Sequence, residues 1–136
     1  MSRARRVLVI LDAFLAFTAI AGGVGLLTGL IAPPIADLEG SPFGTYVIPG
    51  LALLVLVGGG ALAAAIMTVR RHRLASAASA GTGAMIVVFE IVEIAAIGSD
   101  PGVARNLQVF YLLLGSVIVL LAIAQWTAVR RASPSR

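Results

Sequence analysis

Four long apolar stretches, separated by short segments that hold the charged residues, constrain this chain more than any other feature. They cover residues 7–32, 46–69, 74–98 and about 107–129. Each exceeds the ~20 residues that cross ~30 Å of hydrocarbon at ~1.5 Å per residue. Apolar residues make up 60% of the chain and charged residues 12%, against about 45–50% and about 25% in soluble domains. We therefore predict an all-α, polytopic membrane protein whose 136 residues form one membrane domain.

The positions of the arginines predict how the four spans are oriented. All ten basic residues of the chain are arginines. Nine of them lie before the first span, between the second and third spans, or after the fourth span, which places them all on one side of the membrane. These nine are Arg3, Arg5, Arg6, Arg70, Arg71, Arg73, Arg130, Arg131 and Arg136. The segments on the other side contain Asp37, Glu39, Asp100 and a single base, Arg105. Cytoplasmic loops carry the basic excess, so we expect both termini in the cytoplasm and the spans in a bacterial inner membrane.

The lengths of the connections predict the topology of the bundle. Residues 70–73 form a link so short that the second and third spans must be an antiparallel hairpin. The link at residues 99–106 is also short and contains the turn sequence Asp100-Pro101-Gly102. We expect an up-down-up-down four-helix transmembrane bundle. The pair Pro33-Pro34 is expected to stop the first helix, because proline lacks a backbone N–H and restricts the residue before it.

Glycines are concentrated inside the spans, where small residues let helix backbones approach closely. The relevant groups are Gly25 with Gly29, Gly58-Gly59-Gly60 with Ala64, and Gly81 with Gly83. Two interpretations stay open. The glycines either pack the four helices of one chain together, which we favour, or form a face for a second copy or a larger membrane complex.

Three acidic residues fall within the apolar stretches, and an ionised side chain at mid-bilayer costs ~3 kcal/mol or more. Asp12 lies near the arginine-rich side, where we expect it to pair with Arg5 or Arg6. Glu90 and Glu93 are spaced i, i+3, so they project from one helical face in wholly apolar surroundings. Two carboxyl groups that close in a low dielectric are not expected to be ionised together; a shared proton or a bound cation would relieve the cost.

The antiparallel fourth span brings a matching set of polar residues to the same depth. At ~1.5 Å per residue, Gln108 lies near the level of Glu93 and Tyr111 near that of Glu90. Arg105 lies just above them, and Tyr46 from the second span reaches a similar depth. The predicted ligand- or proton-binding residues are therefore Glu90, Glu93, Gln108, Tyr111, Arg105 and Tyr46. The alternative is that these side chains only hold helices together, at ~0.6 kcal/mol per interhelical hydrogen bond.

Several other classes of function are not expected. No set of nucleophile, base and acid is visible, so we predict a protein that is not an enzyme and has no catalytic residues. Ferritin-like sites need Glu-x-x-His from two helices, whereas His72 lies in a basic link, so no metal or other cofactor is expected. The arginines lie at helix ends, which argues against nucleic acid as a partner despite the basic composition.

Residues 41–50, Ser-Pro-Phe-Gly-Thr-Tyr-Val-Ile-Pro-Gly, contain the pattern Pro-Phe-x-x-Tyr-x-x-Pro-Gly at the start of the second span. With Glu93 and Gln108, this pattern resembles a group of uncharacterised short four-span integral membrane proteins of high-GC, actinobacterial-like bacteria. The resemblance covers nearly the whole chain and implies the four-span fold, but no particular activity. Glu90 has no place in the pattern of that group.

Our leading hypothesis is a non-enzymatic membrane protein, expected to be a homo-oligomer such as a dimer. Its intramembrane acidic cluster would open outward and bind a proton, a cation or a small ligand, with transport of that ligand as the bolder version. The alternative is an accessory or scaffold subunit that packs its Gly-rich helix faces against a larger membrane complex.

Overall fold

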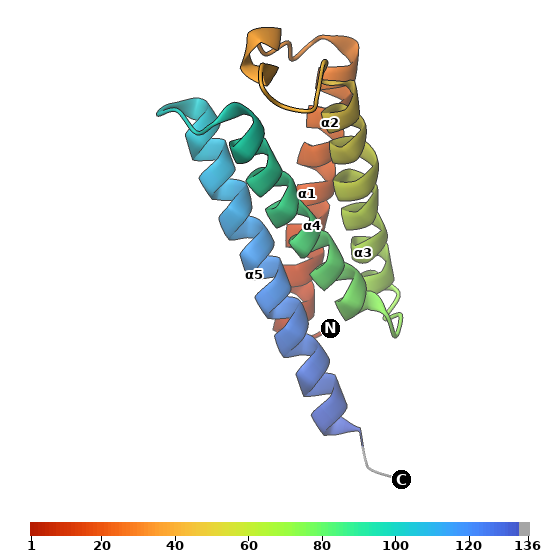
Figure 1. The fold of residues 1–136 in the computed structure, drawn as a ribbon. Helices are drawn as coiled ribbons and strands as arrows, with labels where there is room; N and C mark the ends of the chain where they lie inside the picture. Colours follow the sequence, from red (N-terminus) through yellow and green to blue (C-terminus); the bar gives the residue numbers. More distant parts are fainter. Residues whose placement is uncertain (134–136) are drawn as a thin grey trace.

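A computed structural model describes residues 1–133 of the chain, in which four long antiparallel helices form a bundle (Figure 1). The helical elements are α1 (Arg3–Thr28), the 3-10 turn η1 (Ile35–Leu38), α2 (Val47–Leu51), the π-helical segment η2 (Ala52–Gly59), α3 (Gly60–Val69), α4 (Ala75–Ile97) and α5 (Val103–Ala132). The elements α2, η2 and α3 follow without a break and make up the second span. All four spans are long and apolar enough to cross a membrane. The predicted all-α fold with four antiparallel spans is therefore confirmed.

The bundle has two chemically different ends. We call the end formed by residues 29–46 and 98–102 the loop end, and the end formed by the start of α1, residues 70–74 and the last turns of α5 the arginine end (Figure 1). Of the nine arginines that predicted the orientation, Arg136 lies outside the described residues. Large apolar side chains are exposed along every span, as expected of helices that face lipid.

Each helix packs on its neighbours in the order expected of an up-down-up-down bundle. Helix α4 packs on α5 and α3, and α1 packs on the second span and on α5. Buried apolar side chains at the crossings include Leu15 from α1, Val57 from η2, Ile86 from α4 and Ile118 from α5. The core therefore lies on the bundle axis, and the outward faces of the helices are left to the lipid.

Glycines set the closest helix crossings, and these contacts lie within the chain. A Cβ added at Gly83 would lie 2.7 Å from the carbonyl oxygen of Gly115 on α5. A Cβ at Gly23 would lie 2.8 Å from the carbonyl oxygen of Gly50, and one at Gly58 would lie 2.7 Å from Ile20. Real Cβ atoms essentially never lie this close to another atom, so the helices can approach to this distance only because glycine has no side chain.

Helix α1 ends earlier than the sequence predicted. It stops at Thr28 because Gly29 adopts a left-handed conformation with φ of 78°, which glycine does without steric cost. The backbone N–H of Ile31 then donates to the Gly25 carbonyl at 2.9 Å, so the chain turns back over the last turn. The prediction that Pro33 and Pro34 stop this helix is wrong, since the helix has ended before them.

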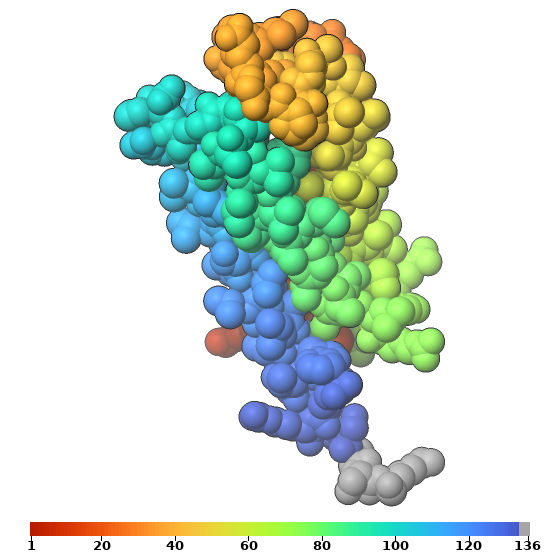
Figure 2. All heavy atoms as spheres, in the orientation of Figure 1, coloured from red at the N-terminus to blue at the C-terminus, as the bar shows by residue number. Residues whose placement is uncertain are grey.

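The segment after α1 covers the loop end of the bundle. It includes η1, whose Leu38 is buried and which contacts α4. In Figure 2 this segment, coloured orange, lies over the ends of the second span and beside the end of α4. The loop thus forms a cover over one side of the bundle rather than projecting away from it.

Candidate functional site

A cavity of about 300 Å³ lies at the loop end, between the second span and α4. Its walls come from α1, the covering loop, α2, η2 and α4. The lining residues are Leu26, Pro33, Leu38, Phe43, Tyr46, Ile48, Pro49, Ala52, Leu56, Val57, Met85, Val88, Phe89, Val92, Glu93, Ala96 and Ile97. We call this the Glu93 pocket, because Glu93 is the only charged residue among them.

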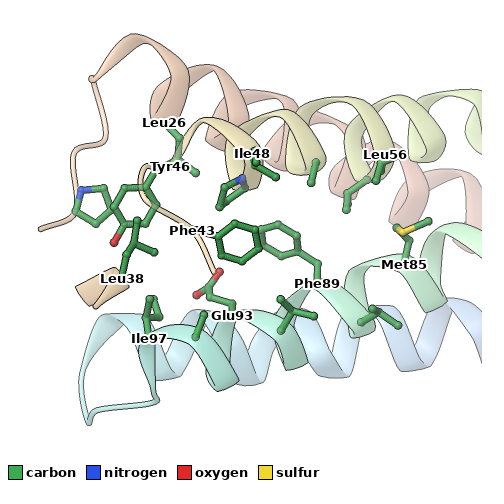
Figure 3. Close-up of a pocket in the computed structure, with 17 residues that line it drawn as sticks. Leu26, Leu38, Phe43, Tyr46, Ile48, Leu56, Met85, Phe89, Glu93 and Ile97 are labelled. Atoms are coloured by element: carbon green, nitrogen blue, oxygen red, sulfur yellow. The ribbon is translucent and has the colours of Figure 1, made fainter. Parts of the chain in front are cut away.

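Helix α4 forms one wall of the Glu93 pocket through a single helical face. Its lining residues recur at the i, i+3, i+4 spacing that places side chains in one stripe, as in Met85, Phe89 and Glu93. Figure 3 shows the Glu93 carboxyl group projecting into the pocket near the rings of Phe43 and Phe89. The carboxyl group thus lies within an otherwise apolar stripe that continues to Ile97.

The opposite wall is a segment of π-helix. Residues 52–59 follow Pro49, which lies in the first turn of the span, and lead into the Gly58-Gly59-Gly60 run. The wider turn of a π-helix replaces the usual i→i−4 ladder and is found often at functional sites. Leu56 and Val57, within this segment, line the pocket. The π-helical segment therefore forms part of the cavity wall.

Gln108 from α5 holds the Glu93 carboxyl group in place. Its Nε2 donates to Glu93 Oε1 at 3.2 Å and to the Gly98 carbonyl oxygen at 3.1 Å. The predicted match in depth between Gln108 and Glu93 is therefore confirmed. Gln108 is 1% exposed, and its own Oε1 has no hydrogen-bond partner.

Glu90 lies one turn deeper and faces the bundle interior, where it is 5% exposed. Together, Glu90, Glu93 and Gln108 carry five side-chain oxygens, of which Gln108 Oε1 is fully buried without a hydrogen-bond partner, while the amide of Gln108 supplies only two N–H donors. A buried acceptor without a donor, such as Gln108 Oε1, costs about 1–3 kcal/mol. The cluster is therefore short of donors, and a proton or a ligand with N–H or O–H groups would complete it.

Tyr46 fastens the covering loop over the pocket. Its hydroxyl donates to the carbonyl oxygen of Pro34 at 3.1 Å, which joins the start of the second span to the loop. Burial, followed by the negative charges of Asp37 and Glu93, raises the pKa of the Tyr46 phenol. The phenol donates to Pro34, and Tyr46 is also one of the residues that line the cavity.

Two predicted site residues lie beside the cluster but contact other groups. The guanidinium of Arg105 donates through Nε and Nη2 to the Ser99 carbonyl oxygen, at 2.9 Å for Nε, so it is turned toward the end of α4 and not toward Glu93. Tyr111 packs against the hydrophobic core, and its ring meets that of Phe110 edge to face at 5.2 Å. Of the six predicted site residues, the structure thus places Glu93 and Tyr46 in the pocket lining and bonds Gln108 to Glu93, whereas Glu90, Arg105 and Tyr111 lie outside the lining.

Asp12 lies in a second buried polar contact, in the half of the bundle nearer the arginine end. It is 0% exposed, and Ser79 Oγ of α4 donates to its Oδ2 at 2.6 Å, while Oδ1 has no partner. The expected pairing of Asp12 with Arg5 or Arg6 is wrong, because the side chain turns inward toward α4. Counting depth from the arginine end would have found Ser79, since both residues lie a few turns inside the same boundary.

The apolar lining was missed from the sequence, although a signal for it exists. The stripe Met85, Phe89, Glu93 follows helical spacing and leads directly to the acid. Comparison with models of known protein families, with curated proteins and with solved structures finds no match. The four long apolar helices support the four-span architecture that the resemblance implies, and no family is identified.

Proposed function

We propose that this protein is a non-enzymatic integral membrane protein that binds an amphipathic cation in the Glu93 pocket. A single observation supports this most strongly: one carboxyl group, held by Gln108, projects into a 300 Å³ cavity that is otherwise almost entirely apolar. Binding pockets for small molecules typically combine apolar walls with a few fixed polar groups. An ammonium head group would bind the Glu93 carboxyl group, and a hydrocarbon chain attached to it would fit the apolar walls.

The lack of donors in the cluster narrows the ligand class further. A primary ammonium carries three N–H donors and a positive charge, so it can bond to Glu93 Oε2 and offer donors to neighbouring acceptors. Charge-assisted hydrogen bonds of this kind contribute about 1.5–3 kcal/mol. A neutral alcohol offers one donor and no charge, and a quaternary ammonium offers charge without donors. We therefore expect primary amines to bind best among ligands with the same hydrocarbon chain.

A proton is the natural competitor for the same carboxyl group. When no ligand is bound, a proton on the Glu90–Glu93 pair removes the cost of two buried charges. Cation binding then displaces a proton, so affinity should fall as the pH falls. A transporter that exchanges a cation for a proton would need this competition. Four spans are few to enclose a path across the membrane, so a homodimer would supply the remaining helices around it.

The contacts of the glycines are the reason we favour ligand binding over the role of an accessory subunit. Gly23, Gly58 and Gly83 meet other helices of the same chain, so these faces are not free for a partner. By the distribution of arginines, we propose that the loop end faces the outside of a bacterial inner membrane.

The proposal can be tested with decylamine and protein in phosphatidylcholine nanodiscs. We expect saturable binding of the amine, weakened at least tenfold in Glu93→Gln, which keeps an amide partner for Gln108 but removes the charge. A tenfold change corresponds to about 1.4 kcal/mol. Decanol and decyltrimethylammonium, compared on the wild-type protein, separate the contributions of charge and donors.

The matched control is Glu39→Gln, which removes one carboxylate from an exposed position in the covering loop. It should bind decylamine like the wild-type protein, because Glu39 does not line the cavity. Equal binding by Glu93→Gln and the wild type would contradict the proposal, as would an equal loss in both variants.

A further inference from the structure

A second cavity, of about 120 Å³, lies at the arginine end and is independent of the Glu93 pocket. It is lined by residues from the start of α1, the end of α3, the link at residues 70–74, the start of α4 and the last turns of α5. Arg5 from α1 and Arg71 and Arg73 from the link all line it, and no carboxylate is among its lining residues. We call it the arginine cavity. Three arginines in the lining of one cavity, with no carboxylate in that lining, give it a positive charge that attracts an anion.

The backbone of the link is fixed in a conformation that an arginine rarely adopts. Arg71 has a φ of 54°, in the left-handed region that favours glycine or asparagine. The His72 N–H donates to the Met67 carbonyl oxygen at 2.9 Å, which holds the turn closed. The left-handed φ is the one that a residue just past the end of a helix adopts when the turn closes back on that helix, so the link holds Arg71 in one defined position in the cavity wall.

His72 and the start of α4 also border the arginine cavity. The Leu74 N–H donates to Nδ1 of His72 at 3.1 Å, so a neutral His72 carries its proton on Nε2. Helix α4 begins at Ala75, and no side chain caps it, which leaves the positive end of the helix dipole beside Ser76 in the cavity wall. These groups add to the guanidiniums, which define the site.

The remaining wall is apolar and aromatic. Leu8, Trp126 and Val129 line the arginine cavity, and the guanidinium of Arg130 lies 3.8 Å from the centre of the Trp126 ring. Tryptophan and arginine at the end of a span mark the level of lipid head groups. The cavity can therefore hold an anion that has a hydrocarbon part as well as one that has none.

We propose that the arginine cavity binds a phosphate group, as a monoester or diester, through Arg5, Arg71 and Arg73. Planar guanidinium groups match the geometry of phosphate oxygens and donate to them in pairs. The same chemistry is offered by the head group of an anionic phospholipid and by a free phosphate-bearing solute.

The test measures binding to the full-length protein in nanodiscs, with two probes. In one arm, phosphatidylglycerol is titrated into phosphatidylcholine nanodiscs and retained lipid is counted by native mass spectrometry. In the other, inorganic phosphate is titrated into nanodiscs of phosphatidylcholine alone. The variants are Arg71→Gly and Arg5→Gln, and the control is Arg131→Gln, which removes the same charge from an exposed position outside the cavity lining.

We expect saturable binding of one probe that falls at least fivefold in Arg71→Gly and in Arg5→Gln and stays unchanged in Arg131→Gln. Saturation by phosphatidylglycerol identifies a lipid phosphate, and saturation by inorganic phosphate identifies a free one; either supports the proposal. The melting temperature of Arg71→Gly should equal or exceed that of the wild type, because glycine adopts a positive φ freely, so a loss of binding there is not a loss of fold. Binding that never saturates, or an equal loss in Arg131→Gln, would show a diffuse basic surface and overturn the proposal.

Discussion

The three acidic residues inside the bundle have three different environments. Asp12 is fully buried with one oxygen bonded to Ser79, Glu90 faces the interior, and Glu93 projects into the Glu93 pocket. A buried carboxyl group is tolerated in a membrane only when it is paired, neutral or functional. Asp12 and Glu93 each accept a hydrogen bond within the chain, from Ser79 and Gln108, but only Glu93 also lines a cavity. Environment, more than depth, therefore separates a structural acid from a binding acid.

The Asp12–Ser79 contact should contribute measurably to stability. We expect a double-mutant cycle of Asp12→Ala and Ser79→Ala to give a coupling energy of about 0.6–1.7 kcal/mol, the range for hydrogen bonds between membrane helices. The measurement is the free energy of unfolding by SDS titration in mixed micelles. Ser116→Ala is the control, because its hydroxyl bonds to Leu112 of its own helix. Strict additivity of the two substitutions would show that the contact contributes nothing.

The depth of a side chain in the bundle follows from the sequence more readily than the direction in which the side chain points. The contact of Gln108 with Glu93 follows from the ~1.5 Å rise per residue once the helices are known to be antiparallel. The inward turn of Asp12 and the contact of Arg105 with Ser99 depend on helix rotation and on side-chain rotamers. Neither quantity is fixed by hydropathy or by the positions of charges.

At the scale of elements, glycines decide how closely α4 and α5 approach. Gly83 and Gly115 face each other across the crossing, where each would place a Cβ 2.7 Å from the carbonyl oxygen of the other. Gly81, two residues before Gly83 on α4, has no atom within 4 Å of an added Cβ. Two glycines of one helix therefore have different roles, although the sequence presents them alike.

This difference gives a matched pair of substitutions. Gly83→Ala should destabilise the bundle by about 1–3 kcal/mol, because backbone meets backbone and cannot yield. Gly81→Ala should be neutral or stabilise it by about 0.5–1 kcal/mol, through the loss of glycine's conformational freedom in the unfolded chain. Unfolding in SDS measures both. Equal effects of the two substitutions would contradict the α4–α5 crossing described above.

The existence of the helices could be predicted from their apolar length, but their irregularities could not. The π-helical turn of residues 52–59 packs against α1 and α4, and no pattern in the local sequence indicates it. The end of α1 was assigned to Pro33 because proline is the stronger helix breaker. Gly29 acts first, since its left-handed conformation lets Ile31 bond back to Gly25.

At the scale of the whole molecule, the two ends of the bundle are chemically distinct. The loop end covers the Glu93 pocket, and the arginine end contains the arginine cavity. A membrane imposes such a difference, because basic residues are retained on the cytoplasmic side. The two cavities therefore face different compartments if the spans are oriented as the arginines predict.

Cysteine labelling tests this orientation cleanly, because the chain has no cysteine of its own. We expect Ser41→Cys and Asp100→Cys, both at the loop end, to react with a membrane-impermeant maleimide in intact cells. Ser2→Cys and Ser133→Cys should react only after the membrane is permeabilised. The reverse pattern would place the Glu93 pocket on the cytoplasmic side and contradict the proposed orientation.

The central claim is that the Glu93 pocket binds the head group of an amphipathic cation at its single carboxyl group. The most direct test is a crystal structure of the protein grown with 10-bromodecylamine, in which anomalous scattering locates the bromine. We predict the ammonium group beside the Glu93 carboxyl group and the bromine among the apolar lining near Met85 and Phe89. Bromine density found only on the lipid-facing surface, with the pocket empty, would contradict the account.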